Sequence, residues 1–331
     1  MAHGRGSGGC DACQRTCPHK NLRPAHLKFA IASVRRLYNH APMRQSSSCH
    51  AILALALASL VSGCKHAPAV NWHHPSPNQD SRVQFLVVHA TEIDFAKSLH
   101  TLTRGDVSSH YLVDRDGTIY GLVPESRRAW HAGPSFWQGA TPLNPSSIGI
   151  EIVSVAPGLA EGTESGFPPA QVQAVTRLLA DIARRHEIRP DRIVGHGEVQ
   201  PDTRSDPGRL FPWKELEARG LVPTTDAAVV EKYRAQFASE GIPDLRWVQD
   251  RLSKHGYQIT CSGILDDHTR RVISVFQGRY RQDRISGDVD LATAALLAAL
   301  TDDHGLVLRM PDGTTKIYST DPPLQSHCLP P

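Results

Sequence analysis

Residues 85–89 read Phe85-Leu86-Val87-Val88-His89, a short apolar and partly β-branched run that ends directly on a histidine. Such a run predicts a buried strand. A second run of this kind, Arg192-Ile193-Val194, comes shortly before His196. Two buried strands that lead to histidines predict an α/β fold in which both imidazoles lie at one edge of a sheet.

A carboxylate follows the second histidine in the stretch Ser205-Asp206-Pro207-Gly208. Imidazole and carboxylate are ligands of hydrolytic zinc sites, where three protein ligands leave a fourth position for water. Glu198 and Asp202 also follow His196 closely, and spacing alone does not choose among the three acids. The sequence therefore predicts a metal site formed by His89, His196 and a nearby carboxylate. The Ser-Asp-Pro-Gly setting of Asp206 favours this residue over the other two acids.

A third apolar strand pattern, Ser147-Ile148-Gly149-Ile150-Glu151-Ile152-Val153, contains a single carboxylate. Burying an unpaired glutamate is costly, so such a residue usually has a partner or a task. Near a metal ion, Glu151 would act as the general base that takes a proton from the attacking water. The alternative is a structural Glu151 paired with an arginine.

The residues after Pro169 carry apolar side chains at helical spacing until Arg189-Pro190. This spacing predicts a helix that presents one apolar stripe to the sheet. Two further short strands flank an Asp-Gly turn at residues 116–117 and predict a hairpin. The predicted fold class is thus α/β, with a mixed central β-sheet flanked by helices.

An ordered set of motifs resembles the zinc-dependent N-acetylmuramoyl-L-alanine amidases, which share a fold with the peptidoglycan recognition proteins. The resemblance covers residues 81–222. The motifs are Val87-Val88-His89-Ala90-Thr91, Ser109-His110-Tyr111, Trp130-His131-Ala132-Gly133, Ser147-Ile148-Gly149-Ile150-Glu151, and Val194-Gly195-His196 through Asp206-Pro207-Gly208.

The resemblance implies that zinc is bound by His89, His196 and Asp206 and that Glu151 is the catalytic glutamate. Arg204 stands where close relatives often have lysine. Arginine stays charged at any working pH, so it suits the stabilisation of an oxyanion but is a poor proton donor. The return of a proton to the leaving amine would then fall to Glu151.

The resemblance also implies what the enzyme acts on. Trp130 and His131 match the family's substrate-groove motif, whereas His110 is expected to be a packing residue. The implied reaction is hydrolysis of the amide between N-acetylmuramic acid and L-alanine in peptidoglycan or muropeptides, for wall remodelling or recycling. Two alternatives are a non-catalytic peptidoglycan-binding protein and a cytosolic amidase specific for anhydro-muropeptides.

A second module is expected after a polar linker at residues 223–240. Residues 241–301 predict a small three-helix domain, and the pattern of Leu265-Asp266 with Thr269 and Phe276-Gln277 resembles the peptidoglycan-binding module. The tail at residues 302–331 carries no interpretable motif. Cys261 and Cys328 lie in these two segments, and an oxidising compartment would allow them to pair.

The amino-terminal part resembles a bacterial lipoprotein signal. An apolar run at residues 52–60 is too short for a comfortable membrane span and leads to Val61-Ser62-Gly63-Cys64, which is similar to a lipobox. The resemblance implies a signal peptide at 43–63, lipidation of Cys64, and a linker at 64–80. Because Lys65 follows the cysteine, we expect an outer-membrane lipoprotein that faces the periplasm.

We expect Met43 to be the initiator and residues 1–42 to be an upstream misread or a dispensable extension. The competing interpretation is a small metal site; its ligands would be Cys10, Cys13, Cys17 and His19.

The composition decides little about partners. The 331 residues have a formal net charge of +3, and no long basic run or aromatic-interleaved basic stripe indicates nucleic-acid binding. With 24 prolines and 25 glycines, the chain has room for two modest domains separated by marked linkers.

Overall fold

The computed structural model describes residues 70–154, 166–320 and 323–329. The chain divides into two units, Met1–Ser76 and Pro77–Pro331. Only residues 70–76 of the first unit are described, and they contain no helix or strand. The expected signal peptide, Cys64 and the cysteines at positions 10, 13 and 17 lie outside the described residues.

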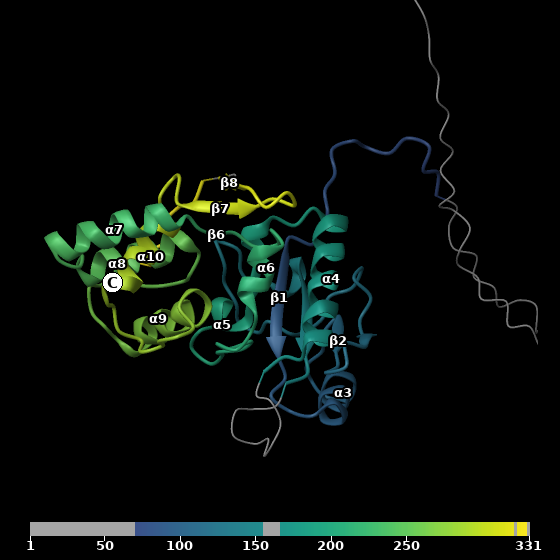
Figure 1. Ribbon diagram of the computed structural model, residues 1–331. Helices are drawn as coiled ribbons and strands as arrows, with labels where there is room; N and C mark the ends of the chain where they lie inside the picture. Colours follow the sequence, from purple (N-terminus) through teal and green to yellow (C-terminus); the bar gives the residue numbers. More distant parts are fainter. Residues whose placement is uncertain (1–69, 155–165, 321–322, 330–331) are drawn as a thin grey trace, which may run out of the picture. The chain divides into compact units, whose positions relative to one another are not determined.

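A five-stranded sheet forms the centre of the first part of Pro77–Pro331 (Figure 1). Its strand order is β3-β2-β4-β1-β5. Neighbouring strands are parallel except β3, which forms the expected hairpin with β2. The strands are β1 (Phe85–Ala90), β2 (Tyr111–Val113), β3 (Ile119–Gly121), β4 (Ser147–Ile152) and β5 (Ile193–Gly195). The mixed central sheet confirms the predicted fold class.

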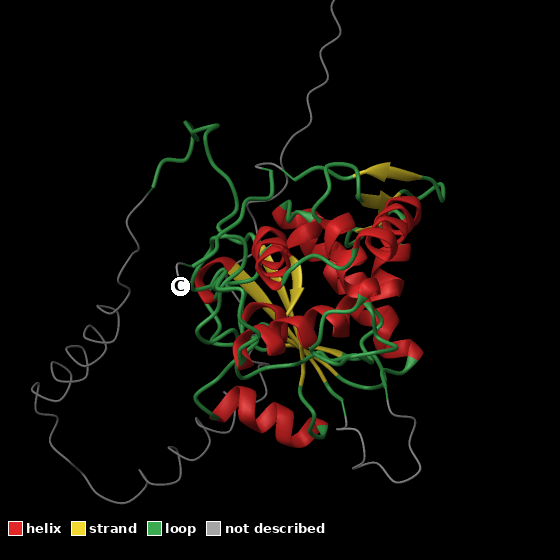
Figure 2. Ribbon diagram, turned by 90° about the vertical axis from the view of Figure 1, so that its left-hand side faces the viewer, coloured by secondary structure: helices red, strands yellow, loops and turns green. Residues whose placement is uncertain are grey.

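Strand β1 is buried on both faces because its alternate side chains pack into two different clusters. Leu86 and Val88 belong to the cluster that contains the apolar stripe of α4 (Pro169–His186), the helix predicted from the spacing after Pro169. Phe85 and Val87 belong to a second cluster, on the opposite face. Figure 2 shows the strands enclosed by helices.

Helix α3 (Phe95–Arg104) connects β1 to β2, and the short helices α5 (His196–Val199) and α6 (Trp213–Ala218) follow β5. Single 3₁₀ turns lie at Asn144–Ser146 and Pro190–Arg192. Helix α5 begins at His196, directly after the last residue of β5. Among the described residues, no helix is both long enough and apolar enough to cross a bilayer.

The carboxyl-terminal module contains the three predicted helices, α8 (Leu245–His255), α9 (Asp267–Tyr280) and α10 (Leu291–Leu300). Each begins after an aspartate whose carboxylate accepts a hydrogen bond from the backbone N–H three residues later. These aspartates are Asp244, Asp266 and Asp290. A side-chain acceptor at this position satisfies one of the free N–H groups of the first turn.

Two segments are more ordered than expected. The predicted linker at 223–240 contains the 14-residue helix α7 (Ala227–Glu240), which buries Phe237 against Ala294 and Ala298 of α10. The tail forms β7 (Leu306–Arg309) and β8 (Thr315–Ile317), which join β6 (Thr224–Thr225) in a three-stranded sheet. Helix α7 has a single buried side chain, that of Phe237, so its apolar residues do not form the stripe that would predict a helix.

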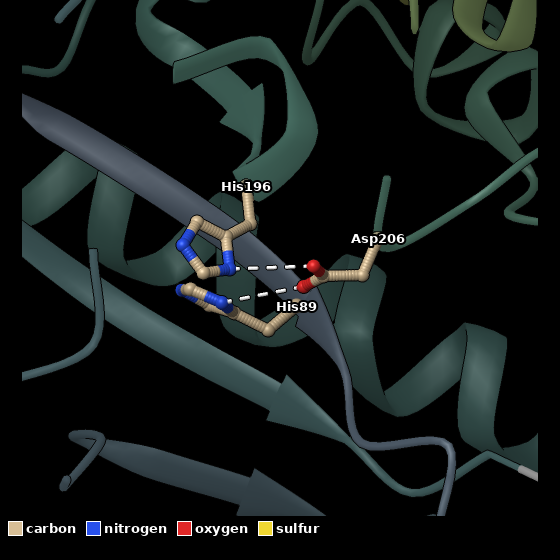
Figure 3. A group of neighbouring side chains, drawn as sticks. All are labelled: His89, His196 and Asp206. Atoms are coloured by element: carbon tan, nitrogen blue, oxygen red, sulfur yellow. Dashed lines mark ion pairs between the residues drawn. The ribbon is translucent and has the colours of Figure 1, made fainter. Parts of the chain in front are cut away.

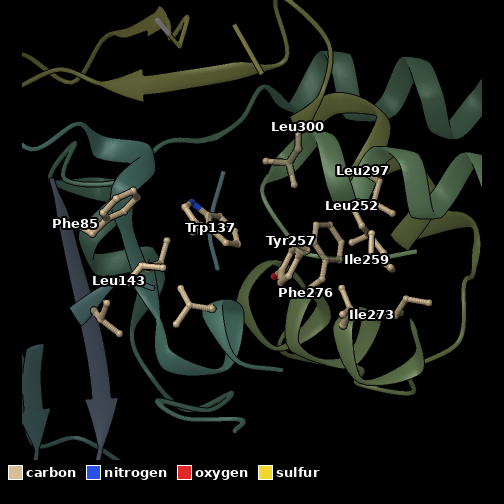
Figure 4. Packing of buried hydrophobic residues seen from close by; sticks show 14 of the residues in the cluster. Phe85, Trp137, Leu143, Leu252, Tyr257, Ile259, Ile273, Phe276, Leu297 and Leu300 are labelled. Carbon is tan, nitrogen blue, oxygen red and sulfur yellow. The ribbon is translucent and has the colours of Figure 1, made fainter. Parts of the chain in front are cut away.

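The helical module shares one core with the central sheet (Figure 4). Trp137 joins the two parts: it belongs to the cluster of Phe85 and packs edge-on against Tyr257, with ring centroids 5.1 Å apart. Gly256 makes this approach possible, because a Cβ there would lie 2.8 Å from the indole. The expected Cys261–Cys328 disulfide is present and ties the tail to the module.

Candidate active site

The candidate residues lie at the edge of the sheet where β1, β4 and β5 end. His89 belongs to β1, and its register partner in the parallel strand β4 is Glu151. His196 is the first residue after β5, which pairs with β1 on its other side. Parallel strands place their carboxyl ends at the same edge of a sheet, so residues far apart in the sequence meet there.

His89, His196 and Asp206 form a compact group of possible metal ligands (Figure 3). The Nδ1 atom of His89 lies 3.4 Å from Oδ2 of Asp206, and Nδ1 of His196 lies 3.3 Å from Oδ1. Both histidines are buried, with 2% and 6% of their surfaces exposed. The three residues predicted to bind a metal are therefore brought together, with one possible ligand atom from each within 4.8 Å of the others.

The surroundings set the protonation of this group. Burial and the neighbouring His196 lower the pKa of His89 to about 4. Burial opposes ionisation of Asp206, but the adjacent side chains of His196 and His89 outweigh it and hold the pKa of this carboxyl well below its usual range. At neutral pH His89 is a neutral imidazole and Asp206 a carboxylate, the forms that bind a divalent cation.

The other two acids that follow His196 have partners away from this point. Glu198 accepts hydrogen bonds from the backbone N–H of Gly195 and from Arg279. Asp202 pairs with His268 at 2.6 Å. Of the three carboxylates that spacing left open, Asp206 is thus the one that faces the histidines.

Each histidine of the group is held through its second ring nitrogen. Nε2 of His196 contacts Oε1 of Gln200 at 3.1 Å, and Nε2 of His89 contacts Nδ1 of His131 at 3.1 Å. The other ring nitrogen of His131 contacts the Ser147 hydroxyl, which donates to the Leu143 carbonyl. Metal-binding histidines typically have such partners, which fix the ring and its tautomer.

The predicted contact of His131 with substrate stays a prediction. His131 lines the cavity above the site, but it is only 7% exposed and both of its ring nitrogens are engaged within the protein. This geometry favours support of His89 over contact with substrate. Sequence analysis did not identify the roles of Ser147 and Gln200. The spacing of Gln200, four residues after His196 and directly after α5, is the available signal for one of them.

His110 is a packing residue, as expected. It is fully buried, its Nδ1 accepts from the backbone N–H of Gly149, and its Nε2 lies 3.1 Å from the carbonyl of Arg127. It therefore supports β4 rather than the ligand group.

A cavity of about 350 Å³ opens above the ligand group. Glu151 and Arg204 line it together with Trp130, which is 52% exposed at its rim. Burial raises the pKa of Glu151 to about 8, and the nearby Asp206 carboxylate adds to this effect. Among the described residues no arginine forms an ion pair with Glu151, and its Oε1 lies 3.9 Å from Nδ1 of the neutral His89.

The rim of the cavity presents an aromatic face backed by a cation. The guanidinium of Arg128 stacks on Trp130 at 4.0 Å from the ring centroid, and Ser108 accepts a hydrogen bond from the Trp130 backbone N–H. The arrangement offers a metal-binding group, a buried carboxylate, a cation at Arg204 and an exposed indole around one open space. These are the elements of a hydrolytic site for a polar substrate.

Two family profiles match the chain. The profile of the N-acetylmuramoyl-L-alanine amidases matches residues 79–209, and that of a peptidoglycan binding domain matches residues 242–297. N-acetylmuramoyl-L-alanine amidase AmiD of Escherichia coli (strain K12) is 36% identical over 268 residues, which are 76% of this chain and 97% of that protein.

Solved structures agree with this assignment. The Escherichia coli AmiD complex with anhydro-N-acetylmuramic acid-L-Ala-D-gamma-Glu-L-Lys has a TM-score of 0.65 and 37% identity, covering 71% of this chain and 95% of that one. AmpDh3 of Pseudomonas aeruginosa has a TM-score of 0.65 and 33% identity, covering 71% of this chain and 98% of that one. On its sequence, fold and site, the chain belongs to the N-acetylmuramoyl-L-alanine amidase family.

Proposed function

We propose that this amidase is zinc-dependent and cleaves the bond between N-acetylmuramic acid and L-alanine through His89, His196, Asp206 and Glu151. The separation of the donor atoms carries the proposal. Ligands about 2.05 Å from a tetrahedral zinc ion lie about 3.3 Å from one another. Nδ1 of His89 lies 3.4 Å from Oδ2 of Asp206, and Nδ1 of His196 lies 3.3 Å from Oδ1 of the same carboxylate. Zinc would take one of these two oxygens, and one ligand atom from each of the three residues already lies within 4.8 Å of the others. Two neutral imidazoles and a carboxylate also suit zinc chemically.

Zinc bound there would act as a Lewis acid, which makes a water molecule more acidic and polarises the scissile carbonyl. Glu151 would take the proton of the attacking water, because its carboxylate lies beside the ligand group and lines the same cavity. It would then return the proton to the leaving amine of L-alanine. A base whose pKa lies near the working pH can serve in both directions.

Arg204 would stabilise the negative charge that develops on the carbonyl oxygen. Its side chain lines the cavity two residues before Asp206, and a guanidinium keeps its charge throughout the reaction. Trp130 would contact the glycan or stem peptide, since its exposed ring is rigid and stacked on Arg128. The solved AmiD and AmpDh3 complexes contain anhydromuramic peptides, which supports soluble muropeptides as substrates here.

The test is mass spectrometry of purified muropeptides incubated with the wild type, with Glu151→Gln, and with chelator-treated protein. We expect free L-alanine-headed peptides from the wild type, and a rate lower by a factor of about 10² to 10⁴ for Glu151→Gln. Chelator treatment should remove activity, and added zinc should restore it. Intact muropeptides in every sample, with wall binding retained, would instead indicate a non-catalytic binding protein.

The proposal includes anchoring of the mature protein to the outer membrane, facing the periplasm, through lipidated Cys64. The lipobox-like run Val61-Ser62-Gly63-Cys64 supports it, as does the Cys261–Cys328 disulfide, because disulfides persist in oxidising compartments. Labelled fatty acid should be incorporated by the wild type and not by Cys64→Ser. Equal labelling of both, or of neither, would contradict anchoring at Cys64 and leave the cytosolic alternative open.

A further inference from the structure

Helix α9 of the peptidoglycan-binding module reaches the loop that joins two of the proposed zinc ligands. Arg279 of this helix has a side chain that is only 5% exposed. Its Nη1 donates to Oε2 of Glu198 at 2.6 Å and to the carbonyl of Ile193 at 3.2 Å. The guanidinium also lies over the ring of Trp213, 4.0 Å from its centroid. The guanidinium of Arg279 thus contacts residues that lie before and after His196 in the sequence.

Glu198 connects this contact to the ligand. Its Oε2 atom, besides binding Arg279, accepts the backbone N–H of Gly195 at 2.7 Å, which caps the short helix that begins at His196. Its other oxygen, Oε1, is buried and has no hydrogen-bond partner among the described residues. The position of this carboxylate therefore depends on Gly195 and Arg279, and the turn that carries His196 depends on the carboxylate.

A second contact holds the same loop farther along. Asp202 lies between His196 and Asp206, and its Oδ1 is 2.6 Å from Nδ1 of His268 and 3.6 Å from Nη1 of Arg271. Both partners belong to α9. One helix of the module therefore contacts the loop at two points, one buried and one at the surface.

Apolar packing between these two contacts is incomplete. A cavity of about 200 Å³ separates the loop around Pro207 from Val275 and Gly278 of α9. A gap of this size has room for water, so the loop and α9 do not pack directly against each other there. Within the amidase part the loop is held by hydrogen bonds such as that from the Gly197 N–H to the Asp206 carbonyl, at 2.7 Å, and the charged contacts are what α9 adds. A buried ion pair is a weak source of stability, because desolvation offsets its attraction, but it fixes geometry by its directional hydrogen bonds.

We propose that the peptidoglycan-binding module is a structural part of the active site and that Arg279 is a positioning residue, which orients His196 and Asp206 through Glu198 and their shared loop. The inference rests on the proposed zinc site. It implies that the module contributes to zinc affinity and to turnover of a small soluble muropeptide, a substrate that needs no tether to the wall.

The test is the double variant Glu198→Gln/Arg279→Met in the full chain. It removes both buried charges together, and glutamine keeps an acceptor for the Gly195 N–H. The matched control is Arg270→Met. Arg270 also belongs to α9, but its ion-pair partner, Asp288, lies within the helical module and not in the loop of the ligands. Zinc affinity is measured by competition with a chromophoric chelator, and kcat and KM are measured on a soluble anhydromuramyl peptide.

We expect the double variant to bind zinc about 10- to 100-fold more weakly and to lose kcat by a similar factor, as for other residues that support metal ligands. KM and pelleting with purified wall should change little, and Arg270→Met should resemble the wild type. A folded double variant whose zinc affinity and kcat stay within about twofold of wild type would overturn the inference. It would show that α9 merely packs against the loop.

A second variant and a separate readout complete the experiment. Asp202→Ala removes the surface contact and leaves no buried charge, so this variant is expected to fold even if the double variant does not. A zinc affinity weakened by several fold would support a positioning role for α9, and an unchanged affinity would contradict it. Zinc affinity also separates the two claims: a wild type that binds zinc but leaves muropeptides intact would refute the proposed function, while the comparison of variants would still decide the role of α9.

Discussion

At the scale of single residues, hydrogen-bond direction determines which nitrogen of His89 is free to bind a metal. A carbonyl can only accept, so Ser147 donates to Leu143 and accepts from Nε2 of His131. The Nδ1 atom of His131 must then accept from Nε2 of His89, which leaves Nδ1 of His89 with its lone pair toward Asp206. Gly149 leaves room for this arrangement, since a Cβ there would lie 2.4 Å from the His131 ring.

We predict that His131→Ala weakens zinc binding by about 10- to 100-fold, because His89 loses the acceptor that fixes its ring and tautomer. Chelator competition measures the change. Gly149→Ala should have a similar effect by displacing His131. The control is His186→Ala, a half-buried histidine bound to Ser81 and Glu125 away from the site, which should lower stability but not zinc affinity. Equal losses of affinity in His131→Ala and His186→Ala would contradict the prediction.

The sequence predicts some of these residues better than others. His89, His196 and Glu151 stand out because each is polar at the end of, or within, an apolar strand. The choice of Asp206 over Glu198 and Asp202 could not be made from spacing, because it depends on Arg279 and His268, which lie far along the chain. The supporting role of His131 was missed for the same reason: its partners belong to other strands.

At the scale of elements, Glu125 joins the end of α4 to the start of β2. Its carboxylate accepts from Arg185 at 2.5 and 2.7 Å, contacts Nε2 of His186 at 2.9 Å, and accepts the Tyr111 hydroxyl at 2.6 Å. These contacts, first that of Arg185, lower the pKa of Glu125 to about 2. The strands and α4 could be predicted because periodicity is local, whereas this junction and α7 depend on contacts distant in sequence.

We predict that Glu125→Gln lowers the free energy of unfolding at neutral pH by about 1 to 2 kcal/mol, a figure reduced for partial exposure. Because the pKa is lower in the folded state than the value of about 4.3 in the unfolded state, the stabilisation is present above about pH 5 and is lost as pH falls toward 2. Urea unfolding of both proteins between pH 7 and pH 3 should show the difference shrinking with acid.

The control for this prediction is Glu215→Gln on α6, which removes a largely exposed ion pair with Arg219, the residue after this helix. Its effect should be small at every pH. A difference between Glu125→Gln and wild type that persists unchanged at pH 3 would show that Glu125 acts through packing rather than charge.

At the scale of the whole molecule, the tail and the module form one structure with the catalytic sheet. Trp137 and Tyr257 lie in a single core, and Cys261 is bonded to Cys328 across 67 residues. The sequence predicted the three module helices and the cysteine pairing, but not the shared core. The apolar side chains that form it resemble those of any independent helical domain.

We predict that Cys261→Ser/Cys328→Ser lowers the free energy of unfolding by about 2 to 4 kcal/mol, because the unfolded chain regains the freedom of the closed loop. Chemical denaturation measures the loss. A reducing agent should destabilise the wild type to the same level and leave the double variant unaffected. Equal sensitivity of both proteins to the reducing agent would point to another cause.

The parallel pairing of β1 with β4 and β5 should allow the metal ion to be removed and exchanged without unfolding the protein. His89 and Glu151 lie in paired strands, and the pairing of β1 with β5 extends to Gly195, directly before His196; none of this involves a metal. Small domains folded only by their metal unfold when it is removed. Here we expect chelation to leave circular dichroism unchanged while it abolishes hydrolysis, whereas unfolding on chelation would contradict this. Cobalt could then replace zinc in the folded protein, as a coloured reporter of the site.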